Sequence, residues 1–293
     1  MNPVVTKMQR YKILHRTYYN FTAPVRLGPH TLLLRPRESH ELRIESASIR
    51  TSPPSSLRWH RDVEDNSVAT ATFDVTTSQL SIESEAIVQH YNQAPLDFLV
   101  ADAAIDYPLL YRPEDMALLA PYMSISTHTP REGSPLARWV ASVWQPGEKI
   151  QTYALLQRLA ARIQQTFTYQ LREEPGVQTS AETLSRRAGS CRDSAFLYME
   201  AVRHLGLAAR FVSGYLNSPP SALNLGATHA WAEVFLPGAG WKGFDPTMGS
   251  VVGTDHIAVA VARLPESVPP VAGSFMGLAQ STLDVGVWVT PLG

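Results

Sequence analysis

The segment from Gly189 to Gly206 most constrains the fold, because a helical pattern there begins at the only cysteine of the chain. Apolar residues follow the cysteine at steps of three and four, as in a helix with one buried face, namely Ala195, Tyr198, Met199, Val202 and Leu205. Gly206 stands where a glycine commonly ends a helix. The pattern predicts a helix with Cys191 in its first turn and Ser190, or the residue before it, as N-cap.

The position of Cys191 suggests two readings. Unpaired backbone N–H groups and the helix dipole favour an anion in the first turn, and a thiolate is such an anion. A lone cysteine is, however, more often a small buried apolar residue. The cysteine is therefore a candidate nucleophile whose role depends on what the rest of the chain places beside it.

A β-hairpin is predicted downstream of this helix. Two runs that alternate in aromatic residues, Thr228–Leu236 and Trp241–Thr247, flank a turn rich in Pro and Gly. His229 and Asp245 lie 16 positions apart, an even separation. Any register that pairs odd with odd positions therefore places both side chains on one face of the hairpin, about one pair-step apart.

Cysteine, histidine and aspartate together suit nucleophilic catalysis. An imidazole can take the proton of a thiol near neutral pH, and a carboxylate can fix the tautomer and orientation of that imidazole. Each residue also has a structural explanation alone, since His229 can be a half-buried histidine and Asp245 before Pro246 can start a turn. The three in this order, on a helix N-terminus and a hairpin, are harder to explain by structure alone.

Four segments resemble the bacterial transglutaminase-like superfamily, which includes transglutaminase-like enzymes and cysteine proteases. They are Gly189–Asp193, Ala208–Leu216, Thr228–Val234 and Gly240–Thr247. The resemblance covers roughly residues 150–250 and implies a papain-like α+β core, in which the cysteine-bearing helix packs on an antiparallel sheet. It also implies that Cys191 is the nucleophile, His229 the base and Asp245 the orienting acid.

The chain departs from many of these relatives around the predicted cleft. Arg192 stands where they carry glutamine, and Met248 stands where they carry asparagine. The residues expected to line the cleft are Arg192, Trp231, Glu233 and Trp241. The alternatives are packing between strand and helix for the tryptophans and a solvated strand position for Glu233.

An antiparallel β-sandwich is predicted ahead of the core. Strand patterns separated by turn signals cover residues 11–19, 31–34, 41–49, 67–75 and 79–88. The region also resembles the N-terminal domain of this bacterial family, through His15, Thr17, Tyr19 and the run Leu34–Arg37. Arg35 and Arg37 could bind an anion, but a solvated edge strand explains two arginines around a proline better.

The remaining patterns complete a three-part organisation of residues 1–90, 91–149 and 150–293. The middle part is a helical connector, with helix starts at Pro113 and Pro135. Further helices are expected over 150–167 and 179–188, before the cysteine. Strands at 256–261 and 283–289 extend either the catalytic sheet or the N-terminal one, and the pattern does not say which.

Composition excludes several classes of function. A net charge of −1 and 17% charged residues give no electrostatic footprint for nucleic acid or for an anionic membrane. Metal-binding, calcium and phosphate-loop motifs are missing from the sequence, so no cofactor is expected. Residues 1–7 lack the pattern of a secretion signal, so a cytoplasmic location is expected.

The expected activity is acyl transfer or amide hydrolysis through a thioester on Cys191. The substrate would be a peptide or protein amide, and the acceptor water or an amine. Two alternatives stay open: a catalytically silent binding module that keeps the fold, and, less well supported, a metal-dependent hydrolase.

Overall fold

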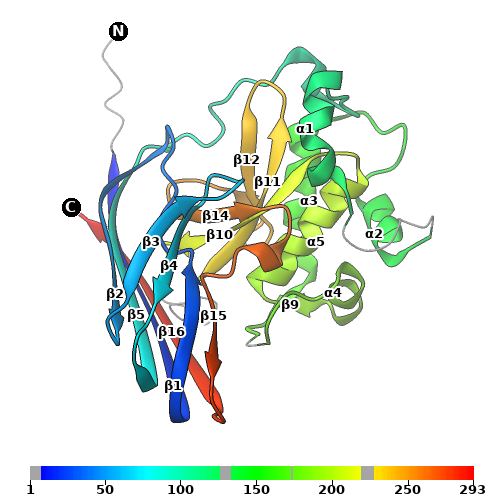
Figure 1. Ribbon diagram of the computed structural model, residues 1–293. Coiled ribbons are helices and arrows are strands. Elements are labelled where there is room, and N and C mark those ends of the chain that lie inside the picture. Colours follow the sequence, from blue (N-terminus) through cyan, green and yellow to red (C-terminus); the bar gives the residue numbers. More distant parts are fainter. Residues whose placement is uncertain (1–7, 126–132, 173, 219–227) are drawn as a thin grey trace.

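The computed structural model describes residues 8–125, 133–172, 174–218 and 228–293. Residues 1–7, on which the expectation of no secretion signal depends, lie outside these ranges. A β domain, a second sheet and a group of helices follow one another across the molecule (Figure 1). The α+β fold class is thereby confirmed. No helix in the described ranges is long and apolar enough to cross a membrane.

The first sheet is organised by β1 (Gln9–Leu32), whose alternating buried residues face the domain core. Its strand order is β2-β5-β1-β4-β3, and all neighbouring strands in this order are antiparallel. The other strands on this path are β2 (Leu42–Ser52), β3 (Ser56–Arg61), β4 (Ser67–Thr72) and β5 (Thr76–His90). Residues 11–19 and 31–32 lie in the one long strand β1, residues 33–34 lie outside any strand, and the other three predicted regions correspond to β2, β4 and β5. β3 had not been predicted, because its exposed sequence lacks an alternating apolar pattern.

The last two strands of the chain also belong to this first sheet. Both β15 (Val271–Met276) and β16 (Ser281–Leu292) pair antiparallel with β1. The sequence left open which sheet the strand at 283–289 extends. It belongs to the N-terminal sheet, to which the chain returns after it leaves the second one. The boundaries 1–90, 91–149 and 150–293 stay a prediction, and strands β15 and β16 extend the first sheet rather than the second.

The connector contains the two helices that its prolines predict. They are α1 (Pro113–Met123) and α2 (Pro135–Val143), each with proline in its first turn. Shorter elements flank them, namely η1 (Asp102–Ala104), β6 (Asp106–Tyr107) and β7 (Ile150–Gln151). Tyr107 packs edge-on against Trp144 and its hydroxyl donates to the Leu205 carbonyl, which ties the connector to the helical layer.

The second sheet has the strand order β13-β12-β11-β10-β14 and carries the predicted hairpin. Its strands are β10 (Ala209–Leu216), β11 (His229–Leu236), β12 (Gly240–Asp245), β13 (Ser250–Val251) and β14 (His256–Ala262). The helices beside it are α3 (Thr152–Thr166), α4 (Ser180–Arg186) and α5 (Cys191–His204). A short parallel pair, β8 (Thr168–Tyr169) with β9 (Ala188–Gly189), precedes α5, and η2 (Pro265–Ser267) follows β14.

Both faces of this second sheet are covered. Small and branched residues of β11, Ala230, Ala232 and Val234, share one hydrophobic core with α5. The opposite face packs on the β domain, where Tyr215 and Ile257 join a cluster with residues of β1 and β5. Burial on both sides holds the ends of β11 and β12 in fixed positions relative to α5, which is what a site shared among them requires.

Candidate active site

A buried carboxylate fixes the start of α5. Asp193 is 0% exposed, and its Oδ2 accepts hydrogen bonds from the Ser190 N–H (2.8 Å) and hydroxyl (2.9 Å). Its Oδ1 accepts from Arg172 Nη1 (2.7 Å) and from the Gln178 N–H (2.7 Å). Burial alone would raise the pKa of Asp193, but these hydrogen bonds lower it. Ser190 and Asp193 form a capping box, so the predicted helix start at Cys191 is confirmed.

The hairpin register places His229 beside Asp245. Odd positions pair with odd ones, as in Glu233 with Gly243, so the expected sharing of a face is confirmed. His229 Nε2 lies 2.7 Å from Asp245 Oδ2. The Asp245 side chain is 0% exposed and the His229 side chain 10%, at the last residue of β12 and the first residue of β11.

Four donors surround the Asp245 carboxylate, which is 0% exposed. Its Oδ1 accepts from the N–H groups of Thr247 (2.8 Å) and Met248 (3.2 Å). Its Oδ2 accepts from His229 and also from His256 Nε2, at 3.0 Å. Burial would raise the pKa of Asp245, but the charge and hydrogen bonds of the two histidines hold it well below its usual range. An ionised carboxylate can only accept, so both rings donate their Nε2–H.

This arrangement sets the protonation of His229. With Nε2–H committed to Asp245, Nδ1 is the ring nitrogen left for Cys191. Burial lowers the pKa of His229, but the Asp245 charge and hydrogen bonds to Asp245 and Cys191 outweigh it and raise the pKa to about 10. The ring is therefore a cation at neutral pH, and a cation beside a thiol favours the thiolate.

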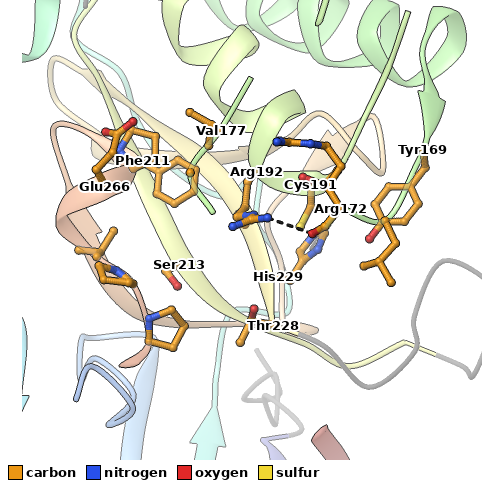
Figure 2. Close-up of a pocket in the computed structure, with 18 residues that line it drawn as sticks. Tyr169, Arg172, Val177, Cys191, Arg192, Phe211, Ser213, Thr228, His229 and Glu266 are labelled. Atoms are coloured by element: carbon orange, nitrogen blue, oxygen red, sulfur yellow. Dashed lines mark hydrogen bonds between the residues drawn. The ribbon is translucent and has the colours of Figure 1, made fainter. Parts of the chain in front are cut away.

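A cavity of about 370 Å³ opens onto the cysteine and the histidine (Figure 2). Cys191 is only 7% exposed, yet it lines this cavity, so it is buried without being sealed in the core. Most other walls are apolar and come from segments far apart in the chain: Tyr169, Leu171, Val177, Phe211, Val268 and Pro269. A substrate group of moderate size can therefore reach the sulfur from the cavity.

Arg192 lines this cavity, as predicted, and two backbone carbonyls hold its guanidinium. In Figure 2 its guanidinium lies between Cys191 and Phe211. Its Nη2 donates to the carbonyls of Arg172 (3.1 Å) and Glu174 (3.2 Å). The side chain is thus fixed next to the sulfur by the segment that precedes α4.

The other three residues expected in the cleft do not line this cavity. Trp231, Glu233 and Trp241 instead border a second cavity of about 300 Å³, together with residues of the β domain such as Arg37. The cause is strand alternation, because Ala230, Ala232 and Val234 of β11 pack on α5, whereas Trp231 and Glu233 lie on the opposite face. The alternative of packing between strand and helix describes Trp241 well, since its ring packs edge-on against Tyr122 of α1, with centroids 5.2 Å apart.

Two elements of the site were missed in the sequence. The capping box had a readable signal, a serine with an acid three residues later at the start of a helical pattern. His256 had none, because its proximity to Asp245 depends on β14 pairing with β10 on the far side of β11. Only the completed sheet brings this third ring to the carboxylate.

Among the described residues, one group has the geometry of a metal site, and it consists of His229, Asp245 and His256. Ligand atoms of His229, Asp245 and His256 all lie within 4.8 Å of one another. Both Nε2 atoms already donate to a single carboxylate oxygen, so a metal ion would have to displace these two hydrogen bonds. The donor set is therefore better described as a hydrogen-bonded array than as a metal centre.

Comparisons with known proteins agree with this geometry. Residues 11–89 match the bacterial transglutaminase-like N-terminal region, and residues 142–246 match the transglutaminase-like superfamily. An uncharacterized protein of Mycobacterium tuberculosis is 30% identical over 296 residues, which cover 96% of this chain and 93% of that protein. An uncharacterized protein of Mycobacterium leprae is 25% identical over 308 residues, covering 97% and 100%.

A solved structure shows the same fold over almost the whole chain. The crystal structure of "a Putative Cysteine Protease from Cytophaga hutchinsonii" superposes with a TM-score of 0.73 and 19% sequence identity, covering 98% of this chain and 91% of that one. Taken with the sequence matches, the likeness extends to both sheets and to the helix that carries Cys191. The chain belongs to the transglutaminase-like superfamily and carries the bacterial N-terminal region of that family ahead of its core.

Proposed function

We propose that this protein is a cysteine-dependent acyl-transfer enzyme that cleaves amides of peptides or proteins through a thioester on Cys191. One observation carries the proposal: His229 is hydrogen-bonded to Asp245 and lines, together with Cys191, the wall of an accessible cavity. A nucleophile, a base and an orienting group in one row are the recurring arrangement of this chemistry.

In the first step the Cys191 thiolate attacks the amide carbonyl carbon, and the carbonyl π electrons move to oxygen. The N–H of Cys191 is a donor for this oxyanion, because the first residue of a helix has no carbonyl one turn before it. Collapse of the intermediate breaks the C–N bond. Protonated His229 gives its Nδ1 proton to the leaving amine, and a thioester remains on the sulfur.

In the second step an acceptor attacks the thioester. Neutral His229 takes a proton from water or from a primary amine, the C–S bond breaks, and the thiolate returns beside an imidazolium. Asp245 stays ionised throughout and stabilises that imidazolium. The triad chemistry is the same for both acceptors, so hydrolysis and amine transfer are separated by experiment.

The cavity indicates the acyl side that the enzyme accepts. Its walls of Leu171, Val177, Phe211 and Val268 favour an apolar side chain next to the scissile carbonyl. Arg192 adds one fixed cation beside the nucleophile. Peptides with an apolar residue beside the reacting amide are therefore the first substrates to test.

The test is incubation with a mixture of such peptides, some containing glutamine, with and without a primary amine, followed by mass spectrometry. A gain of the amine mass indicates transfer, and cleavage or deamidation indicates hydrolysis. Cys191→Ala should abolish either product, and His60→Ala, a change at an exposed histidine of β3, should not. Products that form equally with Cys191→Ala would refute the proposal, whereas peptide binding without any product would favour the silent binding module.

A further inference from the structure

His256 is the one ring at the Asp245 carboxylate to which the steps above assign no part. We propose that His256 is a positioning residue that fixes the Asp245 carboxylate for His229, an inference that rests on the proposed function. It does not touch the substrate in this account. It acts through Asp245, which in turn orients the base.

The two oxygens of Asp245 are held in different ways. Backbone N–H groups of Thr247 and Met248 fix Oδ1 from the turn that follows β12. Oδ2, the oxygen that His229 contacts, has two side-chain partners, and His256 is the second. Without His256, Oδ2 keeps His229 as its one partner in the described structure, and the position of the carboxylate then depends on the group it must orient.

The His256 ring is itself held in the orientation that this role needs. Its Nδ1 accepts a hydrogen bond from the Gly253 N–H at 3.4 Å, which requires the ring proton to be on Nε2. Its Nε2–H then points at Asp245 Oδ2. The ring also packs edge-on against Trp231, with centroids 5.2 Å apart and an interplanar angle of 80°. The two hydrogen bonds thus select the donating tautomer, and the contact with Trp231 packs against the ring.

The surroundings of His256 come from several packed elements. His229 on β11 and Asp245 on β12 lie on one side, and the carbonyl of His256 accepts from His90 of β5. The second cavity, which His256 also lines, adds the charged side chains Arg37, Glu38, Glu41, Arg210 and Glu233. Of these groups, Asp245 is the carboxylate to which His256 donates a hydrogen bond.

The expected effect is a change in the pH dependence of the alkylation rate of the Cys191 thiol. The hydrogen bond from His256 stabilises the Asp245 anion, and that anion stabilises the His229 cation beside the sulfur. His256→Phe keeps a planar ring but removes the donor. The carboxylate is then placed less firmly against His229, so the midpoint of the alkylation rate should move upward, by less than the roughly one to two pH units that a whole hydrogen bond to a charged group is worth (about 1.5–3 kcal/mol).

The experiment measures the rate of iodoacetamide alkylation between pH 5 and pH 10. Because the chain has a single cysteine, the labelling reports one site. His256→Phe should shift the profile, and His256→Gln, which restores an N–H donor, should return most of it. Superimposable profiles for wild type and a folded His256→Phe would overturn the proposal, as would equal shifts for the Phe and Gln variants.

A measurement on the wild type covers the case in which His256→Phe does not fold. Nuclear magnetic resonance of protein labelled with ¹⁵N-histidine reports the tautomer of each ring. His256 should carry its proton on Nε2 with Nδ1 free to accept, and an Nδ1–H tautomer would contradict the proposal. Neither measurement needs turnover. Lack of amide cleavage would therefore count against the proposed function, whereas the role of His256 is tested by the alkylation profiles and the tautomer alone.

Discussion

Replacing Asp245 with asparagine tests the link between the carboxylate and the base most sharply. Asparagine keeps the shape and can still accept from the two backbone N–H groups through its oxygen. Its amide nitrogen then faces the Nε2–H groups of His229 and His256, so donors oppose donors. His229 is expected to move its proton to Nδ1, the nitrogen that the thiol needs as acceptor.

The structure gives the size of this effect. Asp245, with a smaller part from Cys191, raises the pKa of His229 from 6.5 to about 10 against the opposing effect of burial. The whole rise is about 3 pH units or more, on the order of 4–5 kcal/mol at 1.36 kcal/mol per unit, and loss of the carboxylate charge removes the larger part of it. A triad whose histidine is held in the wrong tautomer loses about 10⁴-fold in kcat, and we expect a loss of about that order.

The assay is amide turnover together with iodoacetamide alkylation of Asp245→Asn at pH 7, with urea unfolding to confirm that the variant is folded. The alkylation rate should fall by at least tenfold, because the cation beside the sulfur is lost. A folded Asp245→Asn protein that retains more than a tenth of both rates would refute the reasoning about tautomer and charge.

Three further predictions concern stability and substrate access. The pKa of His229 is raised on folding, so the stability it contributes is complete below pH 6.5 and is lost as pH rises toward about 10; urea unfolding should show this loss in wild type, and an equal slope in His229→Gln would contradict it. Asp193→Ala leaves Arg172 without its buried partner and should lower the free energy of unfolding by about 3–5 kcal/mol; a urea midpoint unchanged from wild type would show that the capping box is dispensable. Val177→Trp should fill part of the cavity and reduce kcat/KM for peptides while iodoacetamide still reacts with Cys191; unchanged peptide kinetics would place the substrate elsewhere.

Local patterns were sufficient for the elements that are locally determined. The helix at Cys191, its N-cap serine and the hairpin depend on periodicity and turn residues within short segments, and these were predicted, whereas the register of the hairpin was left open. The pairing of His229 with Asp245 followed because both lie on one hairpin. The proximity of Cys191 came from the family resemblance, since helix and hairpin meet only through packing of α5 on β11.

Long-range pairing was beyond the sequence patterns. The return of β16 to β1 joins residues more than 250 positions apart, and no local feature of either strand specifies it. The same limit explains the three misplaced cleft residues, because alternation gives the face of β11 but not which layer covers that face. His256 belongs to this class too, as its place beside Asp245 requires the whole sheet.

Direct detection of the acyl-enzyme tests the central claim, that the thiol of Cys191 carries the acyl group. Wild-type protein mixed rapidly with a peptide substrate, quenched in acid and digested, should show the acyl mass on the fragment that contains Cys191, in an amount that falls as the substrate is consumed. Turnover of the same peptide with no adduct on that fragment at any quench time, and undiminished in Cys191→Ala, would contradict the account.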